Sequence, residues 1–170
     1  MTTITLPDTV TPVGTYCFNN CDSLTEATWP AGATTIPERC FHDCDALTSV
    51  VIPEGVTTIN TRAFYSCGAL KNVTMPSTVT SIASDAFQGF AATSAGPVGG
   101  EYDYQFAWTE SIPANAFRGI GNLTSAVIPD SVGVFISFYC FWASKEIIMV
   151  FFGDQWADSV PVFRLLSLSV

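Results

Sequence analysis

The chain has 170 residues, of which 48% are apolar and 12% are charged, and its formal net charge at pH 7 is −9. This length suits one ordinary domain or one short array of repeats, and the apolar content is too high for a disordered chain. The acidic balance excludes the basic surface that nucleic acid or an anionic membrane requires. One histidine and six lysines and arginines leave little material for acid–base or phosphate chemistry.

Targeting signals do not stand out in this chain. Residues 1–7 lack the basic segment and the long apolar segment of a secretory signal. The longest uncharged stretch of the C-terminal half, from Ser131 to Ser144, is shorter than the ~20 residues that a membrane-spanning helix needs. The sequence therefore predicts no membrane insertion and no export signal within the chain.

Three kinds of residue recur every 23 positions along the first half of the chain. They are the prolines Pro7, Pro30, Pro53 and Pro76, the phenylalanines Phe18, Phe41, Phe64 and Phe87, and the leucines Leu24, Leu47 and Leu70. The repeating unit reads L-x-x-V-x-I-P-x-x-V-T-x-I-x-x-x-A-F-x-x-C. One such unit cannot bury its phenylalanine alone, whereas stacked units can, so the period predicts a solenoid with a continuous core.

Each part of the unit has a local prediction. Val50 and Ile52 alternate with a neighbour and predict a short strand with both side chains on one face. Pro53 ends that strand because it has no N–H to donate, and a second short apolar pair follows at 56–59. Residues 63–67, Ala-Phe-Tyr-Ser-Cys, place apolar residues at the spacing of one α- or 3₁₀-helical turn, which would point its phenylalanine inward.

The motif Leu47-Thr-Ser-Val-Val-Ile-Pro-Glu-Gly-Val-Thr-Thr-Ile59, followed by Ala63-Phe-Tyr-Ser-Cys67, resembles the BspA-type leucine-rich repeat of Treponema. The resemblance covers residues 1 to about 90, resumes at 112–117 and 123–129, and fades after Phe141. It implies a right-handed leucine-rich-repeat solenoid with parallel strands on the concave face, and with short strands and helical or 3₁₀ turns on the convex side. It also implies a non-enzymatic module of surface-exposed or secreted microbial proteins that bind macromolecules.

The repeat is interrupted twice. We expect a single solenoid over 1–170, with regular repeats over 1–90, an insertion over 91–108, further repeats over 109–153 and an irregular segment over 154–170. The step from Phe87 to Phe117 is 30 residues, and residues 91–100 have the composition of a loop. The aromatic, acidic residues 101–108 are a candidate for the fifth strand. They form either a recognition loop or a longer connection whose aromatic side chains pack on the solenoid.

A second interruption lies further along the chain. From Val132 to Phe141 the chain takes nine residues where the earlier repeats take eight. Residues 147–153 keep the strand spacing without the proline, and 154–170 are expected to form a cap or a degenerate repeat.

The six cysteines are Cys17, Cys21, Cys40, Cys44, Cys67 and Cys140. The first four, together with His42, lie in two adjacent repeats and are by residue type a candidate zinc site. However, the cysteines occupy small buried positions of the repeat, such as the one held by Ala63, so we expect structural thiols, no metal and no cofactor. Stacked thiols would also lie close enough for disulfides in an oxidising compartment. His42 is expected to face solvent, and no nucleophile motif supports a catalytic residue or an enzyme.

The positions between the inward residues of the strands are small, β-branched and nearly uncharged. The candidate binding residues are Thr5, Glu26, Thr28, Ser49, Val51, Asn72, Thr74, Ser125 and Val127 from the strands, and Tyr102, Tyr104 and Trp108 from the insertion. A threonine file also has good β-propensity without any function, and an ice- or crystal-binding plane is a more remote alternative. The expected partner is a protein or a glycan, and Asn72 and Asn122 begin glycosylation sequons that would block this face.

The first repeat starts without a polar cap. Met1 falls on the repeat position of Leu24 and Leu47. A bare apolar end predicts either a fragment of a longer array or self-association end to end through that end, which is the alternative function. We expect the chain to be extracellular or at the cell surface as part of a longer protein, with a cytoplasmic location left open.

Overall fold

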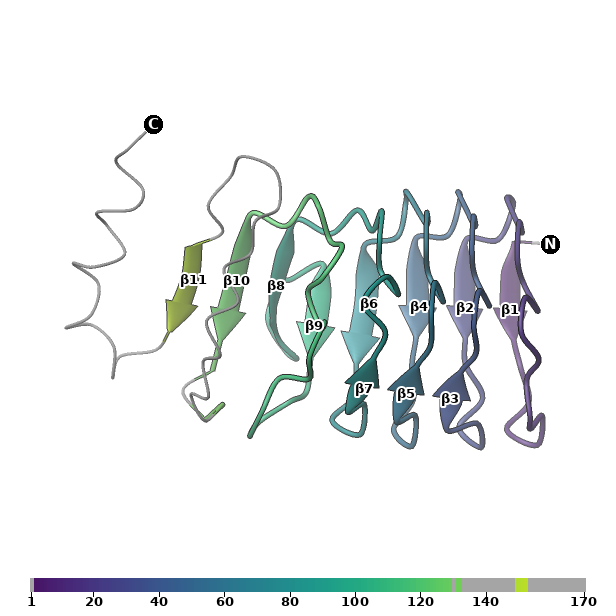
Figure 1. Cartoon of the computed structure of the whole chain (residues 1–170), viewed down its shortest axis with the longest axis horizontal. Coiled ribbons are helices and arrows are strands. Elements are labelled where there is room, and N and C mark those ends of the chain that lie inside the picture. Colours follow the sequence, from purple (N-terminus) through teal and green to yellow (C-terminus); the bar gives the residue numbers. More distant parts are fainter. Residues whose placement is uncertain (1, 130, 133–148, 153–170) are drawn as a thin grey trace.

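The computed structural model describes residues 2–129, 131–132 and 149–152, and in these residues the chain winds into two parallel β-sheets (Figure 1). The eight-stranded main sheet contains, in spatial order, β1 (Thr3–Thr5), β2 (Glu26–Thr28), β4 (Ser49–Val51), β6 (Asn72–Met75), β9 (Tyr104–Phe106), β8 (Ser94–Pro97), β10 (Ser125–Ile128) and β11 (Met149–Phe152). The smaller sheet contains β3 (Thr35–Ile36), β5 (Thr58–Ile59) and β7 (Ser81–Ile82).

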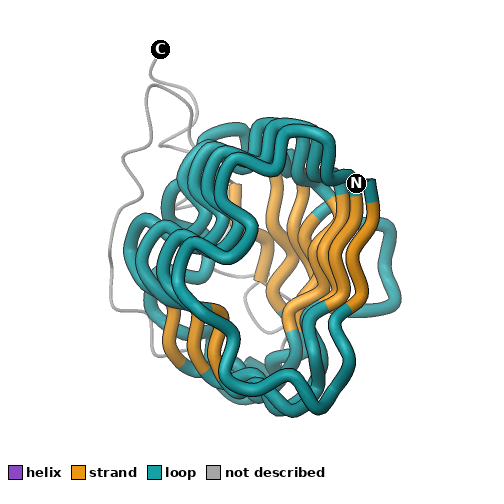
Figure 2. The backbone as a smooth tube through the Cα atoms, turned by 90° about the vertical axis from the view of Figure 1, so that its right-hand side faces the viewer, coloured by secondary structure: helices purple, strands orange, loops and turns teal. Residues whose placement is uncertain are grey.

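The strand register follows the sequence period. In the main sheet Val50 pairs with Val73, and in the smaller sheet Ile36 pairs with Ile59, so both sheets repeat every 23 residues. Seen along the axis in Figure 2, successive turns of the chain superimpose, with the main sheet on one side and the smaller sheet on the opposite side. The predicted leucine-rich-repeat solenoid with parallel strands, and with short strands opposite them, is confirmed.

The phenylalanines of successive repeats stack in the core. Ring centroids lie 5.3 Å apart for Phe18 and Phe41, 5.3 Å for Phe41 and Phe64, and 5.4 Å for Phe64 and Phe87. The ring planes of the last two pairs are nearly parallel, with interplanar angles of 4° and 3°. Because each ring covers the next, the stack removes apolar surface from water along the whole regular part of the array.

The prediction of helical or 3₁₀ turns is wrong for the described residues. They contain hydrogen-bonded turns and no helix. Most of these turns contain two residues in a left-handed conformation, as Arg39 (φ 52°) and Asp43 (φ 56°) are. The amide of Phe41 donates to the carbonyl of Ala63 in the next repeat at 2.8 Å, not to a carbonyl of its own turn. The left-handed residues reverse the chain and aim its N–H groups along the stack, so a helix does not propagate.

The insertion is part of the main sheet. Strand β9 pairs with β6 through Val73 and Tyr104, which confirms the expectation that residues 101–108 supply the fifth strand. The interpretation of 91–100 as a loop is wrong for Ser94–Pro97, which form β8 between β9 and β10. A strand is accepted here because Ala95 and Gly96 are small enough to be buried, and because Pro97 ends the strand, where a missing N–H does least harm.

The second interruption is also seen in the register. Ser125 of β10 pairs with Met149 of β11, an offset of 24 residues, which agrees with the one extra residue between Val132 and Phe141. The predicted irregular segment 154–170 and Cys140 lie outside the described residues.

Candidate binding face

On the outward side of the main sheet the candidate strand residues form two rows that run across the strands. We call this surface the strand face. Alternation along each strand buries the central residue, such as Ala27 or Val50, and turns its neighbours outward. One row is Thr3, Glu26, Ser49 and Asn72; the other is Thr5, Thr28, Val51, Thr74 and Gln105. Val51 is 53% exposed and is the large apolar residue on this surface. The two candidates on β10, Ser125 and Val127, are half-buried and lie beyond β8.

The insertion residues divide into buried and accessible ones. Tyr104 is 0% exposed and Trp108 is 4% exposed, so the expectation that they contact a partner is wrong. Both rings lie in the hydrophobic core. Tyr104 lies edge-on to Phe87 at 6.0 Å and to Phe117 at 5.7 Å, and it bridges the two parts of the phenylalanine stack. The indole N–H of Trp108 donates to the carbonyl of Val79 at 2.9 Å.

Tyr102 is half-buried and remains on the surface, where two glycines fix its position. A Cβ on Gly96 or on Gly100 would overlap the Tyr102 ring, so both positions require glycine for the ring to lie against the backbone. The ring lines a shallow groove of about 100 Å³ between β4, β6 and β9. The side chains that line the groove include Ser49, Val51, Asn72, Thr74, Tyr102, Asp103 and Gln105. The structure thus brings five of the predicted binding residues together in one hollow.

Sequence reasoning missed two residues of the groove, Asp103 and Gln105. The carboxylate of Asp103 accepts hydrogen bonds from the backbone N–H of Thr93 at 2.7 Å and from its hydroxyl at 2.8 Å. Gln105 accepts from the Gly99 amide at 3.3 Å. The signal was the alternation of residues 102–106: if Tyr104 and Phe106 face the core, the residues between and beside them face outward.

Asp103 lines the groove and carries a negative charge. Partial burial acts to raise the pKa of the Asp103 carboxyl. The hydrogen bonds from Thr93 and from the Ser94 amide, helped by the positive charge of Lys71, outweigh that effect, so the pKa lies below its ordinary value. The groove therefore keeps a carboxylate at neutral pH.

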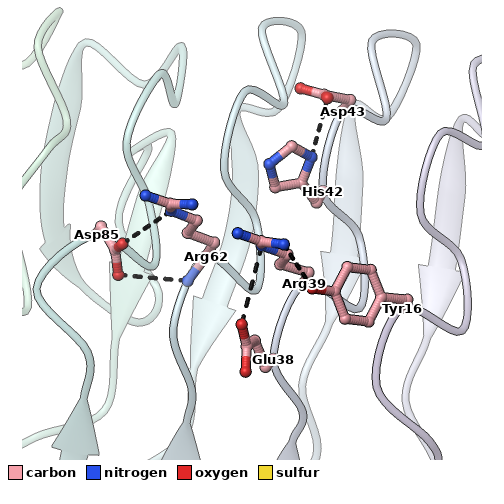
Figure 3. A network of polar contacts seen from close by, with 7 residues as sticks. All are labelled: Tyr16, Glu38, Arg39, His42, Asp43, Arg62 and Asp85. Carbon is pink, nitrogen blue, oxygen red and sulfur yellow. Dashed lines mark hydrogen bonds and ion pairs between the residues drawn. The ribbon is translucent and has the colours of Figure 1, made fainter.

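The turn side of the solenoid, opposite the main sheet, carries a polar ladder (Figure 3). Four successive repeats place Tyr16, Arg39, Arg62 and Asp85 at one position. Arg39 donates to the hydroxyl of Tyr16, and Arg62 pairs with Asp85 at 3.2 Å. Each arginine thus contacts the side chain at the same position of one adjacent repeat.

His42 is also held on the turn side. It pairs with Asp43 at 2.9 Å and stacks on Tyr65 at 5.1 Å. Its side chain is only 19% exposed, so the expectation that it faces solvent is wrong.

The thiols of the described residues are free, and Cys17 is the exposed one. Cys40, Cys44 and Cys67 are buried. Burial raises the pKa of Cys44 to about 11 and that of Cys67 to about 12, so these thiols stay protonated at neutral pH. Within the described ranges, no group of three or more histidine, cysteine or acidic side chains is placed to hold a metal ion. In the same residues no helix has the length and apolar character needed to cross a membrane.

Comparison with known proteins agrees with the fold. A model of the "BspA type Leucine rich repeat region" matches residues 1–94 and 108–157 in six copies, which leaves out part of the insertion. A leucine-rich repeat protein from Bacteroides ovatus is 25% identical, with a TM-score of 0.55, over 77% of this chain and 40% of that one. The T. pallidum leucine-rich repeat protein is 23% identical, with a TM-score of 0.57, over 78% of this chain and 64% of that one.

The chain therefore spans less than two thirds of the length of either solved relative. A search of curated proteins found no significant match. The 23-residue register, the stacked phenylalanines and the six matched repeat copies agree with one another. The chain belongs to the BspA-type leucine-rich repeat family.

Proposed function

We propose that the chain is a non-enzymatic interaction module that binds a protein partner through the strand face, with the groove between β4, β6 and β9 at the centre of the contact. The observation that carries the proposal is the groove itself, because it joins residues of three strands with Tyr102 of the insertion. We propose further that the module is part of a longer protein at a cell surface or outside the cell, and its membership of the BspA-type family supports this.

The physical character of the strand face supports this role. Most of its side chains are short and emerge from in-register strands with a continuous core behind them, so these lose little conformational entropy when a partner covers them. The polar ladder of the turn side, in contrast, is occupied by contacts between its own residues. The strand face, by comparison, carries exposed polar side chains on in-register strands that can serve a partner.

Paired substitutions on the two sides of the solenoid test the proposal. A panel of purified extracellular proteins is screened for binding, and each binder is measured again with the double variant Val51→Arg/Thr74→Arg. The control is Thr61→Arg/Ser84→Arg, which puts the same two side chains on exposed turn-side positions of adjacent repeats. We expect the strand-face variant to lose at least about tenfold in affinity, as a central interface position does, and the control to bind normally. Normal binding by the strand-face variant, with loss in the control, would contradict the proposal.

Self-association through the first repeat stays a prediction. Sedimentation velocity over a wide concentration range tests it, since end-to-end stacking requires mass to grow with concentration. A constant monomer mass counts against stacking and leaves the strand-face proposal intact.

A further inference from the structure

The groove on the strand face has a chemistry that selects for charge. One wall is the Tyr102 ring, held against Gly96 and Gly100, and Val51 adds apolar surface at the rim. Asp103 supplies a carboxylate. An aromatic ring beside a carboxylate is the pair of groups that holds an organic cation, because the ring face and the anion both attract positive charge.

The Asp103 carboxylate is fixed in place and only partly used. Both hydrogen bonds from Thr93 end on Oδ2, and the Ser94 amide also donates to the carboxylate, so its donors all come from residues 93 and 94. The backbone around it is fixed as well, since the Val73 amide donates to the carbonyl of Asp103 at 3.2 Å. Within the described residues the ion pairs are made by Arg39, His42 and Arg62 on the turn side, and Asp103 takes part in none of them. The anion is thus available to a cation from outside.

Charge and size narrow the choice of ligand. The net charge of −9 attracts positively charged partners over a distance. Glu26 lies beside Ser49 on the same face, and adds to the negative potential there. A hollow of about 100 Å³ has room for the end of one side chain and not for a helix. A planar guanidinium fits best, because it stacks on an aromatic ring and binds a carboxylate at the same time.

We propose that the groove takes one basic side chain, arginine by preference, from an extended segment of the protein partner, with its cation between the Tyr102 ring and the Asp103 carboxylate. This inference rests on the proposed function and names the partner's chemistry at its central contact. Lys71 lies close enough to act on Asp103, and a partner's cation must compete with it. We therefore expect the isolated contact to be weak and sensitive to salt.

Short peptides provide a direct test with the whole chain. Backbone amide shifts are followed by NMR while the capped peptide Gly-Ser-Arg-Ser-Gly is added, and then its glutamine counterpart. We expect the arginine peptide to shift the amides of 102–105 and 72–74 and the glutamine peptide to leave them unchanged. Asp103→Asn keeps an acceptor for Thr93 and removes the charge, so it should weaken binding at least about fivefold. The matched control is Asp45→Asn, an exposed acid outside the groove that should bind like the wild type.

A second variant and a neutral probe keep the outcomes distinct. Tyr102→Leu retains apolar bulk and should also weaken the arginine peptide. Equal shifts with both peptides, or unchanged affinity in Asp103→Asn, would overturn the inference. Shifts with N-acetylglucosamine but not with the arginine peptide would overturn it in favour of a glycan. The proposed function fails separately, because it is decided by the affinity of the Val51→Arg/Thr74→Arg variant for a whole protein.

Discussion

The thiol of Cys67 donates a hydrogen bond to the carbonyl oxygen of Phe41 at 2.9 Å. Cys44 makes the same bond to Phe18 at 3.0 Å, one repeat earlier. These carbonyls belong to turns that run beside the phenylalanine stack, and the thiol supplies a donor without bringing a large polar group into the core. The cysteines Cys44 and Cys67 therefore have a structural role, and their burial predicts slow alkylation and a raised pKa.

Native-state alkylation should separate the cysteines by burial. Iodoacetamide reacts with thiolates, and the exposed Cys17 can meet the reagent whereas Cys67 is buried with a raised pKa. We expect Cys17 to be labelled at least about a hundredfold faster than Cys67 at pH 8. Peptide mass spectrometry after timed quenching measures both rates, and labelling in urea is the control. Equal rates in the folded protein would contradict the burial of Cys67.

Alkaline pH should destabilise the fold through the same thiol. The pKa of Cys67 is raised from 9.0 to about 12 in the folded state, so its contribution is intact below pH 9 and is lost as the pH rises toward 12. Cys67→Ala should be less stable than the wild type at pH 7, and the gap should narrow by about 2 kcal/mol at pH 10.5. Urea unfolding at the two pH values measures this.

Leu70→Ala is the control for that experiment, because Leu70 is buried in the same repeat and has no titratable group. Its stability gap to the wild type should be the same at both pH values. If the stability difference between Cys67→Ala and the wild type is also the same at both pH values, the pKa of the Cys67 thiol is not raised in the folded state.

The regular half of the fold could be predicted because one period is repeated in several residue types. The spacing of Pro53 and Phe64 from their counterparts predicts the register, and the one extra residue between Val132 and Phe141 agrees with the offset of 24 between β10 and β11. The candidate strand residues followed from alternation alone. These features are local, so sequence periodicity contains them.

The insertion could not be predicted to the same degree. Strands β8 and β9 are parallel neighbours joined by residues 98–103 alone, shorter than the dozen residues that such a connection usually takes. Residues 94–97 have the composition of a loop and become a strand only because β9 and β10 offer their edges. The burial of Tyr104 between Phe87 and Phe117 depends on how the added strand β9 packs in the array, which local sequence does not contain.

Removing the hydroxyl of Tyr104 should stabilise the protein. This side chain is completely buried, and its hydroxyl has no hydrogen-bond partner among the described residues. An unsatisfied buried hydroxyl costs about 1–3 kcal/mol, so Tyr104→Phe should raise the free energy of unfolding by about 1 kcal/mol. Trp108→Phe is the contrasting variant, because it breaks the bond to Val79 and should destabilise. A loss of stability in Tyr104→Phe would mean that the hydroxyl has a partner in solution.

Two neighbouring glycines should respond differently to alanine. Gly119 has φ +84°, and a Cβ there would lie 2.9 Å from the Cα of Gln88 in the preceding repeat. Gly121 has open space around its Cβ position. We expect Gly119→Ala to cost more than about 1 kcal/mol and Gly121→Ala to change stability by less than about 0.5 kcal/mol. Chemical denaturation compares them, and equal effects would show that the turn is not packed as described.

The docking of the insertion onto β6 is the central structural claim, because the groove exists only if β9 lies there. The Ala107 amide donates to the Met75 carbonyl at 2.9 Å and the Val73 amide donates to that of Asp103 at 3.2 Å, so each bond joins the insertion to β6. Hydrogen exchange followed by NMR at these two amides tests the claim directly. The account predicts protection comparable to that of Phe41 in the regular repeats. Exchange of Val73 and Ala107 at the rate of an unstructured peptide, with Phe41 still protected, would contradict it.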